Sequence, residues 1–105
     1  MAVDFEAVRN LAEAYANDVR EALPIDKAVL YGSFATGKAT SLSDIDVCFF
    51  MPDFGGMSRV DIIVKLLDLT DNYKGTYFEP IVFPTSEIER DNPFVKGILA
   101  TGIEI

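Results

Sequence analysis

The chain of 105 residues contains no histidine and a single cysteine, Cys48. Without histidine, Ser-His-Asp catalysis, Cys-His catalysis, an imidazole general base and histidine-ligated zinc are all excluded. One cysteine excludes an internal disulfide and a cysteine-rich metal site. It also suits a reducing compartment, so we expect a cytoplasmic protein. No stretch approaches the roughly 20 apolar residues that a membrane span needs.

Basic residues are also scarce, since 9 lysines and arginines face 17 aspartates and glutamates and give a formal net charge of −8. This excess of negative charge argues against direct binding to nucleic acid phosphates or to an anionic membrane surface. Half of the residues are apolar, which is enough to bury the core of one domain, and we expect residues 1–105 to form a single domain. We therefore expect any catalysis in this chain to use carboxylates together with a hard cation.

Hydrophobic periodicity predicts alternating helices and strands. A helix precedes Pro24, short strands cover 28–31, 44–51 and 77–83, and the Gly- and Ser-rich stretch 32–43 forms a loop with at most one helical turn. Ser58 caps a middle helix, with Asp61 completing an acidic capping box. The order predicts an α/β fold, in which a small mixed three-stranded sheet is covered by helices.

Two further details of the helices can be predicted. The apolar residues Val60, Ile63, Val64 and Leu67 line one face of the middle helix at helical spacing. Thr85 or Ser86 caps a last helical region, which Pro93 interrupts and which ends near Ala100.

Asp44 and Asp46 lie on one face of the second strand, because successive side chains alternate between faces. Two carboxylates this close repel each other and are costly unless something positive lies between them. Their oxygens suit Mg²⁺, with Mn²⁺ as an alternative, and such ions complete their shell with water and phosphates. Alternatively, the two aspartates only mark the beginning of the strand.

Gly32 and Ser33 end the first strand ten residues before the aspartate pair. Glycine lets the backbone approach a ligand closely, the N–H groups of such a turn can bind an anion, and the serine hydroxyl can donate to a phosphate. The stretch from Gly32 to Ala39 nearly matches a P-loop. It fails at Ala39, which has no hydroxyl for Mg²⁺, and no long helix follows.

Glu79 is a lone charge inside the apolar third strand, where it is costly without a partner. Pro80 suggests an edge strand, on which Glu79 simply reaches water. In the alternative, Glu79 completes a carboxylate triad with Asp44 and Asp46.

These residues resemble a known family. Gly32-Ser33, ten residues and then Asp44-Ile45-Asp46 match the GSx10DxD signature of the minimal nucleotidyltransferases, within the DNA polymerase beta-like superfamily. The resemblance covers nearly the whole chain and implies the nucleotidyltransferase fold. It further implies that Asp44, Asp46 and Glu79 are catalytic and hold two Mg²⁺ ions.

The resemblance also implies a nucleoside triphosphate substrate, with ATP as the expected donor of AMP. Gly32 and Ser33 would bind its β- and γ-phosphates. Many members carry an arginine in a GSxARG-like string, whereas this chain has Thr36 there. Lys38 is the nearest cation and could bind the triphosphate in place of that arginine.

Small members of this kind resemble the antitoxins of HEPN toxin–antitoxin pairs, which transfer AMP to a hydroxyl on the toxin. The implied partner is therefore a HEPN toxin. Two alternatives remain open: an antitoxin-type binding module that neutralises its partner by contact, and a nucleotidyltransferase for a small molecule.

Overall fold

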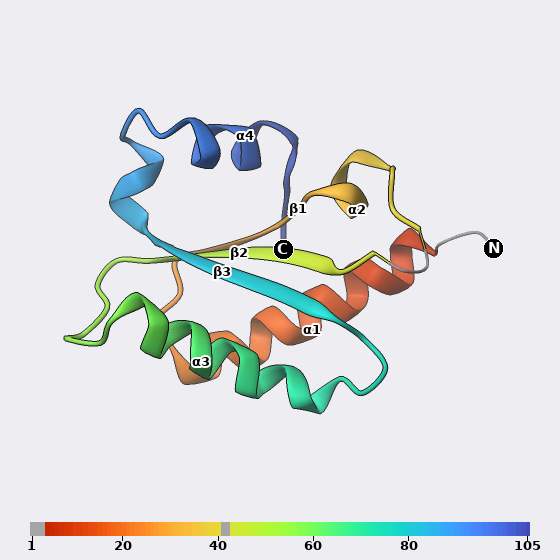
Figure 1. Cartoon of the computed structure of the whole chain (residues 1–105), viewed down its shortest axis with the longest axis horizontal. Coiled ribbons are helices and arrows are strands. Elements are labelled where there is room, and N and C mark those ends of the chain that lie inside the picture. The colour runs from red at the N-terminus through yellow and green to blue at the C-terminus, as the bar shows by residue number, and fades with distance from the viewer. Residues whose placement is uncertain (1–3, 41–42) are drawn as a thin grey trace.

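The computed structural model describes residues 4–40 and 43–105, which form a mixed sheet with helices on both of its faces (Figure 1). The elements in chain order are α1 (Phe5–Ala22), β1 (Lys27–Tyr31), α2 (Ser33–Thr36), β2 (Ile45–Met51), α3 (Arg59–Leu69), the 3₁₀ turn Thr70–Asn72, β3 (Phe78–Pro84), the 3₁₀ turn Thr85–Ile88, α4 (Pro93–Thr101) and β4 (Ile103–Glu104).

The sheet has the strand order β3-β2-β1-β4. β2 pairs antiparallel with β1 and parallel with β3, and β4 pairs antiparallel with β1. The predicted mixed sheet is therefore confirmed, but it has a fourth strand that the sequence analysis missed. β4 is only two residues long, too short for an alternating pattern to indicate it.

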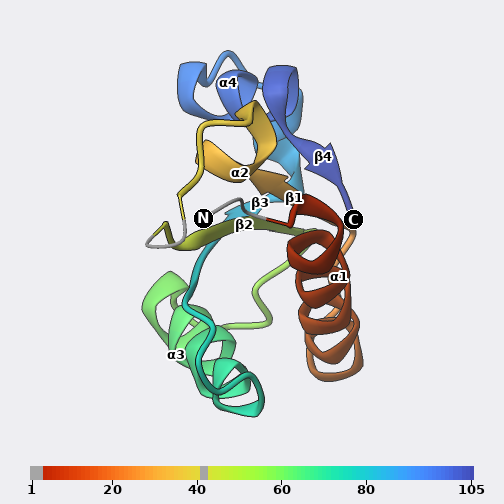
Figure 2. The same cartoon turned by 90° about the vertical axis from the view of Figure 1, so that its right-hand side faces the viewer.

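The helices form layers above and below the sheet. Figure 2 shows α1 and α3 beneath one face, with α4 and α2 over the other. Residues alternate along β2 between the two layers: Val47 and Phe49 belong to the core against α1 and α3, while Cys48 and Phe50 belong to a smaller core against α4. Both faces of β2 are covered, which explains why its sequence is an almost unbroken apolar run.

Helix α1 forms as predicted. The side chain of Asp4 accepts a hydrogen bond from the backbone N–H of Ala7 at the N-terminus, and the buried face consists of Ala12, Tyr15, Ala16 and Val19. The hydroxyl of Tyr15 donates to the carbonyl oxygen of Leu66 at 2.6 Å, and its ring stacks on Phe78 with the centroids 4.5 Å apart. This single side chain therefore links α1, α3 and β3.

Helix α3 has the predicted N-terminus, but the core covers only Ile63 of the predicted apolar stripe. Ser58 and Asp61 make both hydrogen bonds of the capping box. The core side is formed by Ile62 and Leu66, whereas Val60, Val64 and Leu67 are 70%, 51% and 45% exposed. The helix is apolar on more than one side, so spacing alone could not show which stripe the sheet would cover.

The last helix also differs from expectation. Thr85 and Ser86 belong to a separate 3₁₀ turn, and α4 begins at Pro93, which does not interrupt it. Asn92 is the cap, since its Oδ1 accepts from the N–H groups of Phe94 and Val95 at 3.1 and 3.3 Å. Proline is well suited to the first helical position because its missing N–H would have no partner there in any case.

No helix in the described part of the chain combines the length and the apolar character that crossing a membrane requires.

Replacing Tyr15 with phenylalanine should remove the bond to Leu66 while keeping the ring contacts. A buried hydrogen bond lost from one side costs about 1–2 kcal/mol, and urea denaturation should show this decrease in the free energy of unfolding. Tyr77→Phe is the control, because Tyr77 is 75% exposed. Equal stabilities of the two variants would contradict the assigned role of the Tyr15 hydroxyl.

Candidate active site

The turn after β1 brings the chain back over the start of β2. Gly32 has φ 75° and ψ −148°, a conformation that only glycine adopts readily. A side chain at this position would also collide with Oδ2 of Asp46. The backbone of Gly32 therefore packs directly against the Asp46 carboxylate, and the two halves of the GSx10DxD pattern meet at one point.

The strand register brings Glu79 to the same place. Asp46 lies opposite Tyr31 of β1 on one side and opposite Glu79 of β3 on the other. Burial raises the pKa of Asp46 to about 6, with further contributions from the charge of Glu79, a hydrogen bond to Glu79 and the charge of Asp44. β3 is an edge strand and Glu79 is exposed, and the strand register places Glu79 opposite Asp46.

Asp44 lies just before β2 and is exposed. Its charge contributes to the raised pKa of Asp46, so these two carboxylates lie within range of electrostatic interaction. Among residues 4–40 and 43–105, no ion pair involves Asp44, Asp46 or Glu79. Negative charge therefore accumulates here without a cationic side chain to balance it.

The donor set fits a hard divalent cation, because carboxylate oxygens are the ligands that Mg²⁺ and Mn²⁺ prefer. Within the described residues, no group of three or more His, Cys, Asp or Glu side chains is arranged to hold a metal ion. A cation at Asp46 and Glu79 would therefore take other ligands from water and phosphate oxygens, as Mg²⁺ commonly does.

Thr36 and Lys38 follow the turn. The Thr36 hydroxyl donates to the carbonyl oxygen of Gly32 at 3.2 Å, so this residue supports the turn. The N–H of Lys38 donates to the carbonyl oxygen of Ser33 at 2.9 Å. The Lys38 side chain is exposed, and no ion pair of the described residues involves it.

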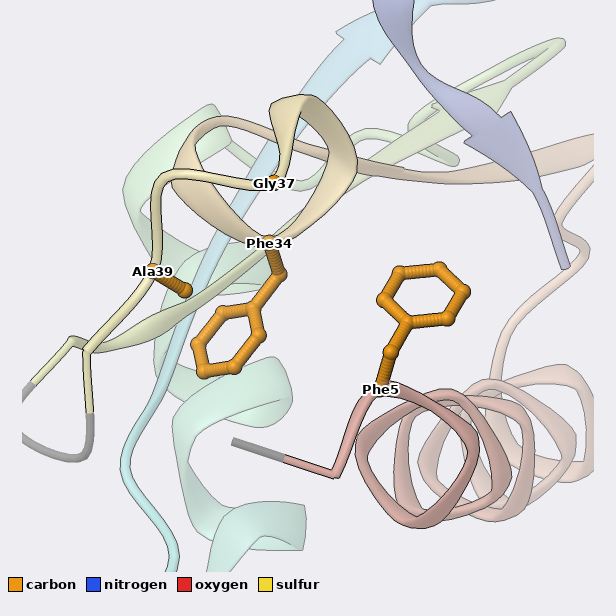
Figure 3. Close-up of a pocket in the computed structure, with 4 residues that line it drawn as sticks. All are labelled: Phe5, Phe34, Gly37 and Ala39. Carbon is orange, nitrogen blue, oxygen red and sulfur yellow. The ribbon is translucent and has the colours of Figure 1, made fainter. Parts of the chain in front are cut away.

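One apolar side chain, Phe34, attaches helix α2 to the main core. Phe34 is buried in the main core, and with Phe5, Gly37 and Ala39 it lines a pocket of about 200 Å³ (Figure 3). In the figure the ring of Phe34 points away from α2 toward the layer where α1 begins, and the ring of Phe5, the first residue of α1, stands across the pocket from it. The anchored ring holds Gly32 and Ser33, at the start of the turn, against the sheet.

Tyr31 is a neighbour of the carboxylates that the sequence analysis did not single out. Burial, followed by the nearby Asp46, Cys48 and Glu79, raises the pKa of its hydroxyl, so Tyr31 stays protonated at neutral pH. Its position just before Gly32 gave no signal of this role, because the register of β1 against β2 determines which side chain lies opposite Asp46.

Residues 12–99 match the family model described as a nucleotidyltransferase domain. The chain belongs to this nucleotidyltransferase family. A crystal structure of a candidate nucleotidyltransferase from Sulfolobus solfataricus has the same fold, with a TM-score of 0.69 and 20% sequence identity over 95% of this chain and 80% of that protein. No curated protein sequence matches the chain.

The contact between Gly32 and Asp46 can be tested in this nucleotidyltransferase with two glycines of similar φ. Gly37 has φ 77°, but a Cβ there would meet no atom within 4 Å. We expect Gly37→Ala to cost about 1–2 kcal/mol of stability through backbone strain alone. Gly32→Ala should cost clearly more and should displace the Asp46 carboxylate. Because ψ also differs, at −148° for Gly32 and 13° for Gly37, chemical denaturation of Gly32→Ala is repeated in Asp46→Ala, where the additional loss should shrink. An unchanged loss would contradict the contact.

The raised pKa of Asp46 predicts that ionisation of this carboxylate lowers the free energy of unfolding. The folded state holds a proton on Asp46 more tightly than the unfolded chain, whose pKa is near 3.8. The ionised carboxylate therefore destabilises the fold above about pH 6, and this penalty disappears as the pH falls toward 4. In metal-free buffer, Asp46→Asn should raise the melting temperature at pH 7.5 and lose that gain near pH 4. The exposed Asp68→Asn is the control, and a gain at pH 7.5 that persists at pH 4 would count against this explanation.

Proposed function

We propose that this nucleotidyltransferase transfers AMP from ATP to a hydroxyl on a partner protein in a reaction that requires Mg²⁺. The observation that carries the proposal is the packing of the Gly32 backbone against Asp46, with Glu79 on the neighbouring strand. A turn suited to phosphate and a group of unbalanced carboxylates thus lie at one point, which is what a triphosphate with its cation requires.

In this proposal Gly32 and Ser33 hold the β- and γ-phosphates, with Lys38 as an additional point charge. Asp44, Asp46 and Glu79 would hold the Mg²⁺ ions. When bound, these ions supply neutralisation of the phosphate charge and alignment of the attacking and leaving oxygens.

The reaction itself is a displacement at the α-phosphorus. The acceptor hydroxyl oxygen forms the new bond to phosphorus, the bond to the bridging oxygen of the β-phosphate breaks, and pyrophosphate leaves with that electron pair. Glu79 would accept the hydroxyl proton, and its exposure at the edge of the sheet beside Asp46 supports this role. No histidine is needed at any step.

The resemblance to HEPN-associated antitoxins supports a HEPN toxin as the partner. With a net charge of −8, the chain would complement a basic, RNA-binding protein. The free and buried thiol of Cys48 is compatible with a reducing cytoplasm.

A second candidate function is neutralisation of the partner by contact alone. The exposed side chains of Val60, Val64 and Leu67 favour it, since an apolar stripe on a helix is typical of a protein-binding surface. Thr36 in place of the arginine of many relatives also weakens the case for tight triphosphate binding.

Transfer of label from ATP, in the presence of Mg²⁺, to the protein encoded by the neighbouring gene distinguishes these two functions. We expect label on the partner with the wild type, and a decrease of at least a hundredfold with Asp44→Asn/Asp46→Asn because the cation loses its ligands. Asp68→Asn, an exposed acidic residue outside the site, is the matched control and should retain full transfer.

Equal transfer by the double variant would overturn the catalytic proposal. Full neutralisation of the partner by the double variant would instead support binding by contact. Transfer to a small acceptor without any protein would reassign the substrate to a small molecule.

A further inference from the structure

A second pocket adjoins the candidate active site on the side of α4. It has a volume of about 330 Å³ and lies between the end of β1 and one face of the helix. Its lining consists of Tyr31, Gly32, Pro93, Phe94, Gly97, Ile98 and Thr101. The volume falls at the lower end of the roughly 300–1,000 Å³ that is usual for small-molecule sites.

The pocket is continuous with the catalytic residues through two of its members. Gly32 packs against the Asp46 carboxylate, and Tyr31 lies opposite Asp46 in the sheet. The base of a nucleoside triphosphate is separated from its α-phosphate by one ribose. A base whose phosphates lie at Gly32 and Ser33 must therefore be found close to this end of β1.

The side chains that line the pocket are uncharged, and two of them are aromatic. None of the seven residues carries a charge at neutral pH, because Tyr31 stays protonated. Phe94 is 55% exposed, although its ring makes an edge contact with Tyr31 at 6.5 Å and a tilted contact with Phe83 at 5.8 Å. In a chain of net charge −8, this is a surface suited to the neutral, flat part of a nucleotide.

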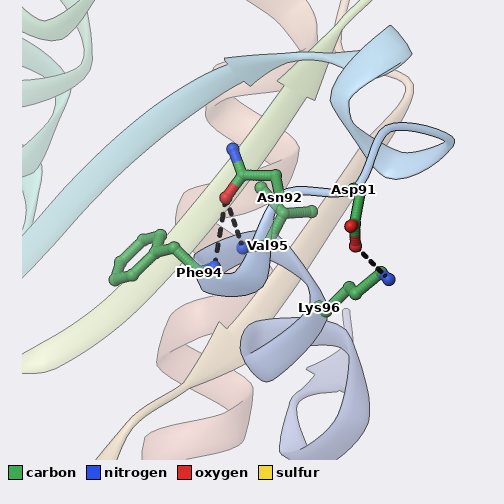
Figure 4. A network of polar contacts seen from close by, with 5 residues as sticks. All are labelled: Asp91, Asn92, Phe94, Val95 and Lys96. Atoms are coloured by element: carbon green, nitrogen blue, oxygen red, sulfur yellow. Dashed lines mark hydrogen bonds and ion pairs between the residues drawn. The ribbon is translucent and has the colours of Figure 1, made fainter.

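The start of α4 fixes the backbone of Phe94. Asn92 accepts from the N–H groups of Phe94 and Val95, and Lys96 pairs with Asp91 at 2.5 Å on another side of the same turn (Figure 4). In the figure the Phe94 ring projects away from the charged pair. The cap fixes the backbone that carries the Phe94 ring, and the ring itself contacts Tyr31 and Phe83, which lowers the entropy lost when a ligand packs on it.

Gly97 keeps the pocket open one turn further along α4. No atom lies within 4 Å of a Cβ built at this position, so a side chain there would extend into free space. A glycine inside a helix costs about 0.5–1 kcal/mol relative to alanine. Its presence at this position leaves room beside the Tyr31 and Phe94 rings.

We propose that this pocket is the nucleoside subsite, in which the base of the triphosphate packs against Phe94 and Tyr31 over Gly97. This inference rests on the proposed function. The Thr101 hydroxyl is already bonded to the carbonyl oxygen of Gly97 at 3.2 Å, so few polar groups remain to read the edge of the base. Recognition is then mainly stacking, which tolerates different bases and favours the larger purines.

Comparing the affinities for ATP and for inorganic tripolyphosphate, each with Mg²⁺, distinguishes the contribution of the base from that of the phosphates. By calorimetry, Phe94→Ala should weaken ATP binding about tenfold, and Gly97→Leu, which fills the pocket, by at least as much. Both variants should bind tripolyphosphate as the wild type does. Phe94→Trp should retain ATP binding, and Gly97→Ala is the matched control, because a methyl group fits the free space. ATP and GTP should differ by less than tenfold.

The outcomes distinguish the proposed nucleoside subsite from the proposed function. Wild-type affinity for ATP in folded Phe94→Ala and Gly97→Leu, with folding checked by circular dichroism, would overturn the nucleoside subsite and leave the proposed function intact. Tripolyphosphate binding that is absent, or unaffected by Asp44→Asn/Asp46→Asn, would instead overturn the proposed function. The subsite would then stand only if ATP binding still depended on Phe94 and Gly97. A wild type that binds neither probe overturns both.

Discussion

The packing of the Gly32 backbone against the Asp46 carboxylate is the constraint on which the rest of the site depends. It requires a residue without a side chain, in a backbone conformation that other residues avoid, at the end of β1. It also keeps Asp46 partly desolvated beside Glu79 and Asp44, which is why the pKa of Asp46 is raised. The ionised Asp46 is unfavourable for the protein alone, and in the proposed function a bound cation would offset this cost, as is common where stability and activity oppose each other.

The fold keeps this contact in place with apolar packing on every side. β1 and β2 are joined through their antiparallel register, and Phe34 fixes α2 to the main core. The smaller core under α4 supports the opposite face of the same strands. Of the three carboxylates, Asp46 is the one that is partly buried, whereas Asp44 and Glu79 are exposed. The lower local dielectric at Asp46 strengthens its interaction with any neighbouring charge.

The sequence predicts local features well and long-range pairing poorly. The spacing of Gly32-Ser33 and Asp44-Asp46 was visible because the turn and the strand that carry these residues are adjacent in the chain. The position of Glu79 beside Asp46 depended on the register of β3, and that of Phe94 beside Tyr31 on how α4 packs. On α3 the spacing could not show which apolar side chains the core covers: Ile62 and Leu66 are buried with Ile63 beside them, whereas Val60, Val64 and Leu67 are exposed, and only the assembled sheet decides this.

The pocket proposed for the base and the exposed apolar stripe of α3 lie on opposite layers of the molecule. The uncharged pocket lies between β1 and α4, whereas the exposed side chains of Val60, Val64 and Leu67 belong to α3, beneath the other face of the sheet. A partner bound through α3 would not occlude the pocket. Its hydroxyl would have to reach the carboxylates around the β3 edge, where Glu79 is exposed. Contact and catalysis are therefore separable in this fold, because no residue of the α3 stripe belongs to the site that would hold the nucleotide.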